Sequence, residues 1–239
     1  MSLQKMPMLE TTAMSAKKLG LNPPKTDIDR FVYAISHDLN EPLRMVSSFI
    51  KLAQNNAGKE SGGEYLNMAL QNADQLKRMI NALVDLSRVT RTNQEKIALK
   101  PKALLSEVNS MYRSELQARE IVFSFDCDDE VVVVEEQLIT VFKELIQNVL
   151  DHSGKEVSSY HISSKQLGDK VEFVCIAQND CLKTITLNQI FDVFSSGKKS
   201  HHHIGMGLTL ARACVEHNGG EMWATEGEHL EIRFTLPKA

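Results

Sequence analysis

Two long stretches of the sequence place apolar residues at steps of three and four, and this pattern limits the fold more than any other feature. The apolar positions of the first stretch are Ile28, Phe31, Ile35, Leu39, Leu43, Val46, Ile50 and Ala53. Those of the second stretch are Leu66, Ala69, Leu70, Ala73, Leu76, Ile80, Leu83 and Leu86. This spacing is typical of amphipathic helices. The sequence therefore predicts two helices, the first beginning at Asp27 and about 45 Å long, joined as an antiparallel hairpin by a turn around Gly58, Gly62 and Gly63.

Two apolar stripes on one hairpin have consequences for assembly. A single hairpin cannot cover both stripes, whereas two hairpins bury them together in a four-helix bundle. The sequence therefore predicts a homodimer. The segment ahead of Asp27 has no helical period and closes on Pro23-Pro24, so we expect residues 1–26 to form a flexible leader.

The helical pattern fades after Arg91, and a mixed region begins at Lys100-Pro101. We expect strands near residues 121–125, 131–134, 158–165, 170–177, 220–225 and 229–236, and helices near 102–118, 137–151 and 207–217. These elements predict an antiparallel or mixed sheet that helices cover on one face. The expected fold class is thus α+β, with a dimerising hairpin over residues 27–92 and an α/β sandwich domain over residues 93–239.

Charge and composition argue against several classes of function. The chain has 31 acidic and 27 basic residues and a net charge of −4, so it has no basic field to hold nucleic acid. No apolar run approaches the roughly 20 residues that a membrane helix needs, so we expect a cytoplasmic chain without membrane insertion. The cysteines form no C-x-x-C pair, which argues against a disulfide framework or a zinc site.

His37 lies off the apolar stripe of the first helix. It is two residues from both Ile35 and Leu39, which places it about 200° from the stripe and facing water. Asp38 beside it can orient the imidazole or take its proton. An incidental surface histidine is the alternative on periodicity alone. Proline costs a helix interior about 3 kcal/mol, so Pro42 indicates a functional bend close to His37.

The segment from Ser36 to Arg44, with the sequence Ser-His-Asp-Leu-Asn-Glu-Pro-Leu-Arg, resembles the phosphoacceptor box of two-component sensor histidine kinases of the bacteriophytochrome type. The resemblance covers residues 27–239 and implies a dimerisation hairpin followed by an ATP-binding domain like that of gyrase. It implies that His37 accepts a phosphoryl group, that Asp38 is its acid–base partner, and that an aspartate of a response regulator receiver domain exchanges the group. Glu41 stands where many members place a Thr or Asn that serves dephosphorylation of the regulator.

Other segments resemble the nucleotide motifs of the same family. The helix from Val141 to Leu150 resembles the Asn box, which implies that Asn148 gives an oxygen to the Mg²⁺ carried by ATP. Glu144 shares a face with Asn148, and such oxygen ligands suit a hard cation. The segment with Gly205 and Gly207 resembles the second glycine box, whose backbone amides hold phosphate at a helix N-terminus.

Several residues depart from the family's nucleotide site. Gln178 stands where the family has the aspartate that binds the adenine amino group, and Asp180 and Leu182 replace two glycines. Asp151 replaces a basic residue that meets phosphate, and the lid from Ser195 to Ile204 is short. We therefore expect adenine binding to be weakened or lost.

Three functions follow from the resemblance and these departures. The first is a phosphorelay phosphotransferase in which His37 exchanges a phosphoryl group with regulators and no cofactor is bound tightly. The second is an ATP-dependent autokinase that binds ATP and Mg²⁺ through Glu144, Asn148, Gln178, Gly205 and Gly207. The third is a dimeric adaptor that docks regulators without transferring phosphate. We rank the relay slightly above the autokinase, and the adaptor last.

Overall fold

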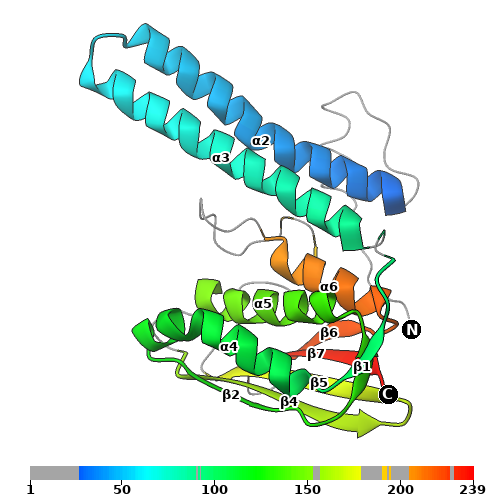
Figure 1. The fold of residues 1–239 in the computed structure, drawn as a ribbon. Coiled ribbons are helices and arrows are strands. Elements are labelled where there is room, and N and C mark those ends of the chain that lie inside the picture. The colour runs from blue at the N-terminus through cyan, green and yellow to red at the C-terminus, as the bar shows by residue number, and fades with distance from the viewer. Residues whose placement is uncertain are drawn as a thin grey trace, which may run out of the picture.

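The computed structural model describes residues 27–89, 91, 93–152, 157–178, 190–192, 194, 205–226 and 229–239, so the predicted leader lies outside the described residues. The elements in chain order are α2 (Asp27–Asn55), α3 (Glu60–Val89), β1 (Ile97–Leu99), α4 (Pro101–Ala118), β2 (Val122–Asp126), β3 (Val131–Val133), α5 (Glu135–His152), β4 (Ser159–Leu167), β5 (Lys170–Gln178), α6 (Gly207–His217), β6 (Met222–Glu226) and β7 (Leu230–Pro237). Figure 1 shows the hairpin of α2 and α3 beside a body in which α4, α5 and α6 lie on one face of a sheet. The predicted α+β class, a helical hairpin followed by an α/β sandwich, is confirmed.

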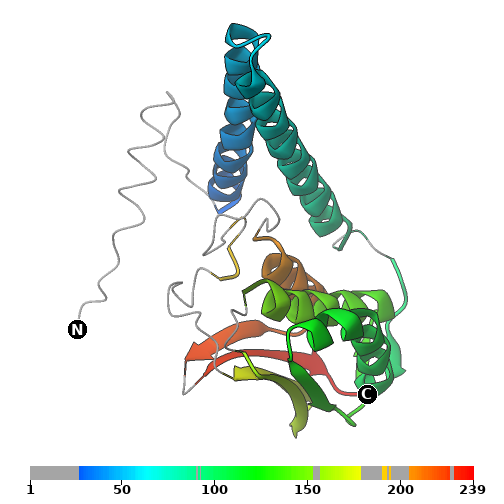
Figure 2. The ribbon, with the colours of Figure 1, turned by 90° about the vertical axis from the view of Figure 1, so that its left-hand side faces the viewer.

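The two helices of the hairpin pack against each other near the turn and diverge toward their other ends (Figure 2). The small side chains of Ala53 and Ala69 are buried, which lets the helices approach each other closely. The rings of Phe49 on α2 and Tyr65 on α3 stack with their centroids 6.5 Å apart. Pro42 lies inside α2 and is buried. The apolar stripes thus join the helices into the predicted hairpin.

The turn of the hairpin is shorter than predicted. Helix α2 ends at Asn55 and α3 already begins at Glu60, so the turn holds Gly58 but not the other two glycines. Gly62 and Gly63 lie instead in the first turn of α3. A glycine lowers helix stability by only about 1 kcal/mol, so the packing of α3 on α2 outweighs this local preference.

The hairpin leaves part of its own apolar stripes uncovered. Leu70 is 64% exposed, the largest such value among the large apolar side chains of α2 and α3 that the structure describes. Other stripe residues that are exposed are Leu43, Ile50, Leu66 and Ile80. A single chain therefore does not bury the apolar surface that the sequence pattern provides.

The main sheet is mixed and has the strand order β2-β4-β5-β7-β6. Strand β2 runs parallel to β4, and the other neighbouring pairs are antiparallel. The strand predicted near 131–134 is present as β3, but it lies outside this sheet. It pairs instead with β1, a strand that the sequence pattern did not predict, with Ile97 opposite Val133.

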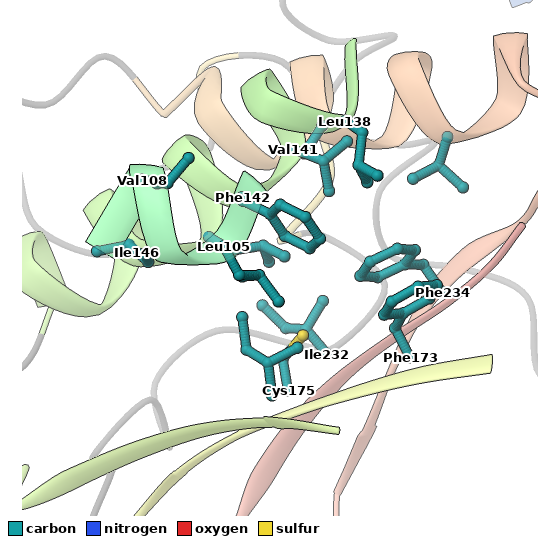
Figure 3. Packing of buried hydrophobic residues seen from close by; sticks show 14 of the residues in the cluster. Leu105, Val108, Leu138, Val141, Phe142, Ile146, Phe173, Cys175, Ile232 and Phe234 are labelled. Atoms are coloured by element: carbon teal, nitrogen blue, oxygen red, sulfur yellow. The ribbon is translucent and has the colours of Figure 1, made fainter. Parts of the chain in front are cut away.

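The core of the second body lies between the sheet and the helices (Figure 3). The rings of Phe173 on β5 and Phe234 on β7 stack with their centroids 4.5 Å apart and their planes 3° from parallel. Phe142 on α5 packs on this pair, with its ring centroid 6.4 Å from that of Phe173. These three rings fix α5 over the middle of the sheet, so its position is set by apolar packing.

The helices carry charged and polar residues along their length. Helix α2, for example, contains Arg30, Asp38, Glu41, Arg44 and Lys51. Among the described residues, no helix has a stretch that is both long and apolar enough to cross a membrane.

Candidate functional site

His37 lies on the solvent side of α2, as its offset from the apolar stripe predicts. Its side chain is 51% exposed, whereas Leu39 is half-buried and Pro42 is buried. Its Nδ1 atom lies 3.0 Å from Oδ1 of Asp38, which is a hydrogen-bond distance. The helix therefore presents the imidazole to a partner from solution while the neighbouring carboxylate holds one side of the ring.

This contact determines which ring nitrogen is free to react. A carboxylate only accepts hydrogen bonds, so the bond to Asp38 requires the proton of a neutral imidazole to be on Nδ1. The lone pair of His37 is then on Nε2. Asp38 also lies close enough to stabilise the positive charge that the ring gains when Nε2 forms a bond. The pair can thus act as an exposed nitrogen nucleophile with a fixed orientation.

The candidate nucleotide residues lie on α5, at the end of β5 and at the start of α6. Glu144 and Asn148 are one turn apart on α5 and are half-buried. Gly205 precedes α6 with φ of +70°, and Gly207 is the first residue of α6. The structure brings Glu144 against Gly207, because a Cβ built on Gly207 would lie 2.5 Å from Oε2 of Glu144. The Asn-box helix and the glycine segment therefore meet, as the resemblance implies.

The charges around Glu144 are largely negative. Burial raises the pKa of the Glu144 carboxyl, and the carboxylates of Asp151 and Asp85 raise it further, whereas Lys143 lowers it. Asp151 accepts a hydrogen bond of 2.7 Å from the side-chain amide of Gln147. Asp151, which stands where the family has a basic residue, is thus held by a hydrogen bond. It places negative charge beside Glu144.

Gln178 is the last residue of β5, where its backbone lies opposite Ser159 of β4 and its side chain is exposed. The predicted departures at Asp180 and Leu182 and the lid at 195–204 lie outside the described residues.

Phe191, in the segment 190–194 that precedes the lid, is buried against α6. Its backbone carbonyl accepts a hydrogen bond of 3.0 Å from the hydroxyl of Thr209. The guanidinium of Arg212 lies 5.4 Å from the centre of its ring, a cation–π distance. These contacts attach Phe191 to the first half of α6.

The residues on α5 suit a metal ion, and the start of α6 suits phosphate. The side-chain oxygens of Glu144 and Asn148 are the ligands that Mg²⁺ prefers, and the negative surroundings favour a cation. Phosphate would bind at the start of α6, where backbone N–H groups are available. The carboxylate of Glu144 already lies against the first residue of that helix. This carboxylate occupies the space beside Gly207, where a phosphate would approach the helix.

A cleft of about 610 Å³ lies beside the junction of α3 with the second body. Its lining comes from the end of α3, the following linker, and residues of α5 and α6. The cationic residues among the lining are Arg88, Arg91 and Lys143. Their positions follow from how the hairpin joins the body rather than from a periodic pattern, so the sequence does not predict them.

Two family models match the chain. The model described as His Kinase A (phospho-acceptor) domain matches residues 27–92. The model described as Histidine kinase-, DNA gyrase B-, and HSP90-like ATPase matches residues 133–239. The first match contains His37 and Asp38, and the second contains Glu144, Asn148 and the glycine segment.

Curated proteins resemble the chain over most of its length. Cyanobacterial phytochrome A of a Nostoc species is 23% identical over 225 residues, which is 91% of this chain and 29% of that protein. Sensor protein kinase WalK of Staphylococcus saprophyticus is 24% identical over 220 residues, which is 87% of this chain and 36% of that protein. The chain thus spans about a third of the length of these relatives.

Solved structures share the fold at low sequence identity. The histidine kinase AdeS of Acinetobacter baumannii has a TM-score of 0.62 at 17% identity, over 84% of this chain and 98% of that one. The histidine kinase ThkA, solved in complex with the response regulator protein TrrA, has a TM-score of 0.65 at 16% identity. That match covers 99% of this chain and 68% of the other.

Proposed function

Because the chain belongs to the two-component sensor histidine kinase family, we propose that His37 carries a phosphoryl group that it exchanges with an aspartate of a response regulator receiver domain. The observation that carries this proposal is the exposed imidazole of His37 with its Nδ1 atom 3.0 Å from Asp38. The similarity to a kinase solved with a response regulator supports the class of partner.

The transfer follows from the tautomer that Asp38 selects. The Nε2 lone pair of His37 attacks the phosphorus of an aspartyl phosphate on the regulator. An N–P bond forms as the P–O bond to the aspartate breaks, and the carboxylate leaves with the electron pair. The proton stays on Nδ1, so the ring becomes cationic and the charge of Asp38 stabilises it. The reverse step passes the group to the aspartate of a second regulator.

We propose that residues 27–92 act as the dimerisation and phosphoacceptor hairpin and that residues 93–239 form an ATP-binding domain whose site is weakened. The exposed apolar residues of α2 and α3 support pairing with a second copy in a four-helix bundle. The weakening is supported by Gln178 at the end of β5 and by the carboxylates of Glu144 and Asp151 near the phosphate end. The relay is therefore our first candidate.

The autokinase is the second candidate, and one contact favours it. The Asn-box helix and the glycine segment meet at Glu144 and Gly207, so two parts of the nucleotide site remain adjacent. In that function Glu144 and Asn148 would hold Mg²⁺, which neutralises phosphate charge during transfer. A rotation of the Glu144 side chain away from Gly207 would be required before phosphate could approach α6.

The test uses two phosphoryl donors side by side. Receiver domains phosphorylated with labelled acetyl phosphate are mixed with the protein, and gamma-labelled ATP with Mg²⁺ is offered in parallel. The relay predicts acid-labile label on the protein from a receiver domain and not from ATP, whereas the autokinase predicts it from ATP.

The His37→Gln variant should lose labelling by either route. The matched control His161→Gln removes another histidine, on β4, and should keep it. Failure of both donors to label a folded protein would overturn both functions and leave the regulator-docking adaptor.

A further inference from the structure

Two buried amide side chains meet where the hairpin joins the second body. Gln137 on α5 is 6% exposed, and Asn218, the C-cap residue that follows α6, is 3% exposed. The Nδ2 atom of Asn218 donates a hydrogen bond of 2.7 Å to Oε1 of Gln137. Buried amides are costly unless their hydrogen bonds are satisfied, so such a pair specifies one geometry.

Gln137 connects this pair to the hairpin. Its Nε2 atom donates a hydrogen bond of 3.2 Å to the backbone carbonyl of Val89, the last residue of α3. The Val89 side chain is 8% exposed and belongs to the apolar core of the second body. The end of α3 is thus held by a hydrogen bond at its carbonyl and by apolar packing at its side chain.

The same two amides hold the C-terminal end of α6. Oε1 of Gln137 also lies 3.0 Å from Nδ1 of His217, and since this oxygen only accepts, the histidine nitrogen is the donor. Asn218 donates a second bond of 2.8 Å to the carbonyl of Cys214, and its Oδ1 accepts a bond of 2.8 Å from the backbone N–H of Val134. We call Gln137, His217, Asn218 and the Val89 carbonyl the Gln137 network.

Helix α6 has the candidate site at its other end. It begins at Gly207, against Glu144, and is 11 residues long, so it joins the Gln137 network to the glycine segment within one rigid element. A displacement of the end of α3 therefore acts on α6 through Gln137. Because a buried hydrogen bond is either made or broken, such a junction favours discrete orientations over continuous sliding.

We propose that Gln137 is a positioning residue that fixes the orientation of the hairpin, and so of His37, relative to α6 and the glycine segment. The consequence for phosphoryl transfer rests on the proposed function, but the positioning itself does not. It can be measured as a distance in a protein that transfers no phosphate.

The experiment measures the distance between two spin labels by pulsed electron paramagnetic resonance. Encoded spin-labelled amino acids replace Lys51 on the hairpin and Glu107 on α4, which are both exposed. Doubly labelled chains are mixed with excess unlabelled chain so that only distances within one chain contribute. The wild-type protein should give one narrow distance distribution.

Two substitutions separate the parts of the Gln137 network. Gln137→Met has a similar length and removes all three hydrogen bonds of the side chain. Gln137→Glu, measured at pH 8, keeps the acceptor for Asn218 and His217 and loses the donor to Val89. We expect both variants to broaden the distribution at least twofold. Gln94→Ala is the matched control, because it removes the exposed bond of 2.7 Å from Gln94 to Glu136 at the same junction, and it should keep the narrow distribution.

Circular dichroism first establishes that each variant is folded, and if Gln137→Met is not, Gln137→Glu decides. An unchanged distribution in the folded variants would overturn the proposal. A distribution that stays narrow in Gln137→Glu and broadens in Gln137→Met would also overturn it, since the bond to α3 would then not hold the hairpin. A wild-type protein that transfers no phosphoryl group, while the distances still broaden in the Gln137 variants, would overturn the proposed function and leave the positioning intact.

Discussion

The carboxylate of Glu144 on α5 fills the space beside Gly207, where a Cβ would lie 2.5 Å from its Oε2 atom. The obstacle is the flexible end of a side chain, so the two helices do not clash through their backbones. Gly220 makes a closer approach of a different kind, since a Cβ there would lie 1.8 Å from the backbone carbonyl oxygen of Thr235. The two glycines therefore differ in what a side chain would displace.

This difference predicts unequal effects of alanine substitution. We expect Gly207→Ala to change the free energy of unfolding by less than about 1 kcal/mol, because Glu144 can rotate and alanine favours the helix. Gly220→Ala must move the strand that carries Thr235 and should cost about 3 kcal/mol or more. Urea unfolding of both variants measures the two values, and equal losses would contradict the assignment.

The raised pKa of Glu144 predicts a pH-dependent effect of Glu144→Gln. The unfolded chain ionises this carboxyl near its ordinary pKa of 4.5, while burial and Asp151 delay ionisation in the folded chain. The Glu144 carboxyl is therefore accommodated in the folded chain at low pH, where it is neutral. Its ionisation lowers the free energy of unfolding as the pH rises. The glutamine variant should melt at a higher temperature than the wild type at pH 8, and the difference should shrink at pH 4. Thermal unfolding at both pH values tests this, with the exposed Glu107→Gln as control.

Glu172 on β5 predicts the opposite pH dependence. It is 5% exposed and lies 2.8 Å from Nζ of Lys165 and 3.1 Å from a guanidinium nitrogen of Arg233. The hydrogen bond from Lys165, and then the one from Arg233, lower the pKa of Glu172 below 4.5. The stabilisation is thus complete above pH 4.5 and lost as the pH falls through the lowered value.

Glu172→Gln should therefore lower the free energy of unfolding at pH 7 by on the order of 1 kcal/mol. The deficit should shrink below pH 4.5, where the wild-type carboxyl also becomes neutral. Denaturant unfolding across this range checks the sign. A deficit that is constant with pH would show that the ion pairs are not its cause.

The contact between His37 and Asp38 predicts a graded effect on phosphoryl transfer. Asp38→Asn keeps an oxygen that can accept from Nδ1 but removes the charge that stabilises the cationic ring. We expect the transfer rate to fall on the order of 100-fold, the lower end of what acid–base partners contribute. Rapid-quench assays with a labelled receiver domain measure the rate, and Asp74→Asn on α3 should leave it unchanged. An unaffected rate in Asp38→Asn would remove Asp38 from the mechanism.

The exposed apolar side chain of Leu70 predicts the oligomeric state. If a second hairpin covers it, Leu70→Glu places a charge in the bundle and should convert a dimer to a monomer at micromolar concentration. Analytical ultracentrifugation distinguishes the two masses. Asn67→Glu adds the same charge at another exposed position of α3 and should remain dimeric. A wild-type monomer at high concentration would contradict the pairing.

The sequence allowed α2, α3 and the exposure of His37 to be predicted because a helix repeats every 3.6 residues, and long stripes record that period. Strand β1 was missed because it has three residues and pairs with β3 across 34 positions, which leaves no periodic signal. The strand positions in the second body followed from short apolar runs, whereas the parallel pairing of β2 with β4 could not be predicted from them.

Parts of the candidate site also lie beyond what a pattern can indicate. The spacing of Glu144 and Asn148 predicts that they share a helix face, but it does not place Gly207 beside Glu144. The hydrogen bond between Gln137 and Asn218 joins residues 81 positions apart. Such contacts depend on how whole elements pack, which local sequence does not encode.

Val89 belongs to α3 by covalent structure and to the second body by packing. A chimeric protein that joins this hairpin to a foreign ATPase body after residue 92 would therefore bring a foreign surface to Val89. The exchange would leave an unfilled space or an overpacked one in the recipient core. A crossover placed within α3, before Val89, keeps the residue with the core it completes, so recombination between relatives should be tolerated better there than in the linker.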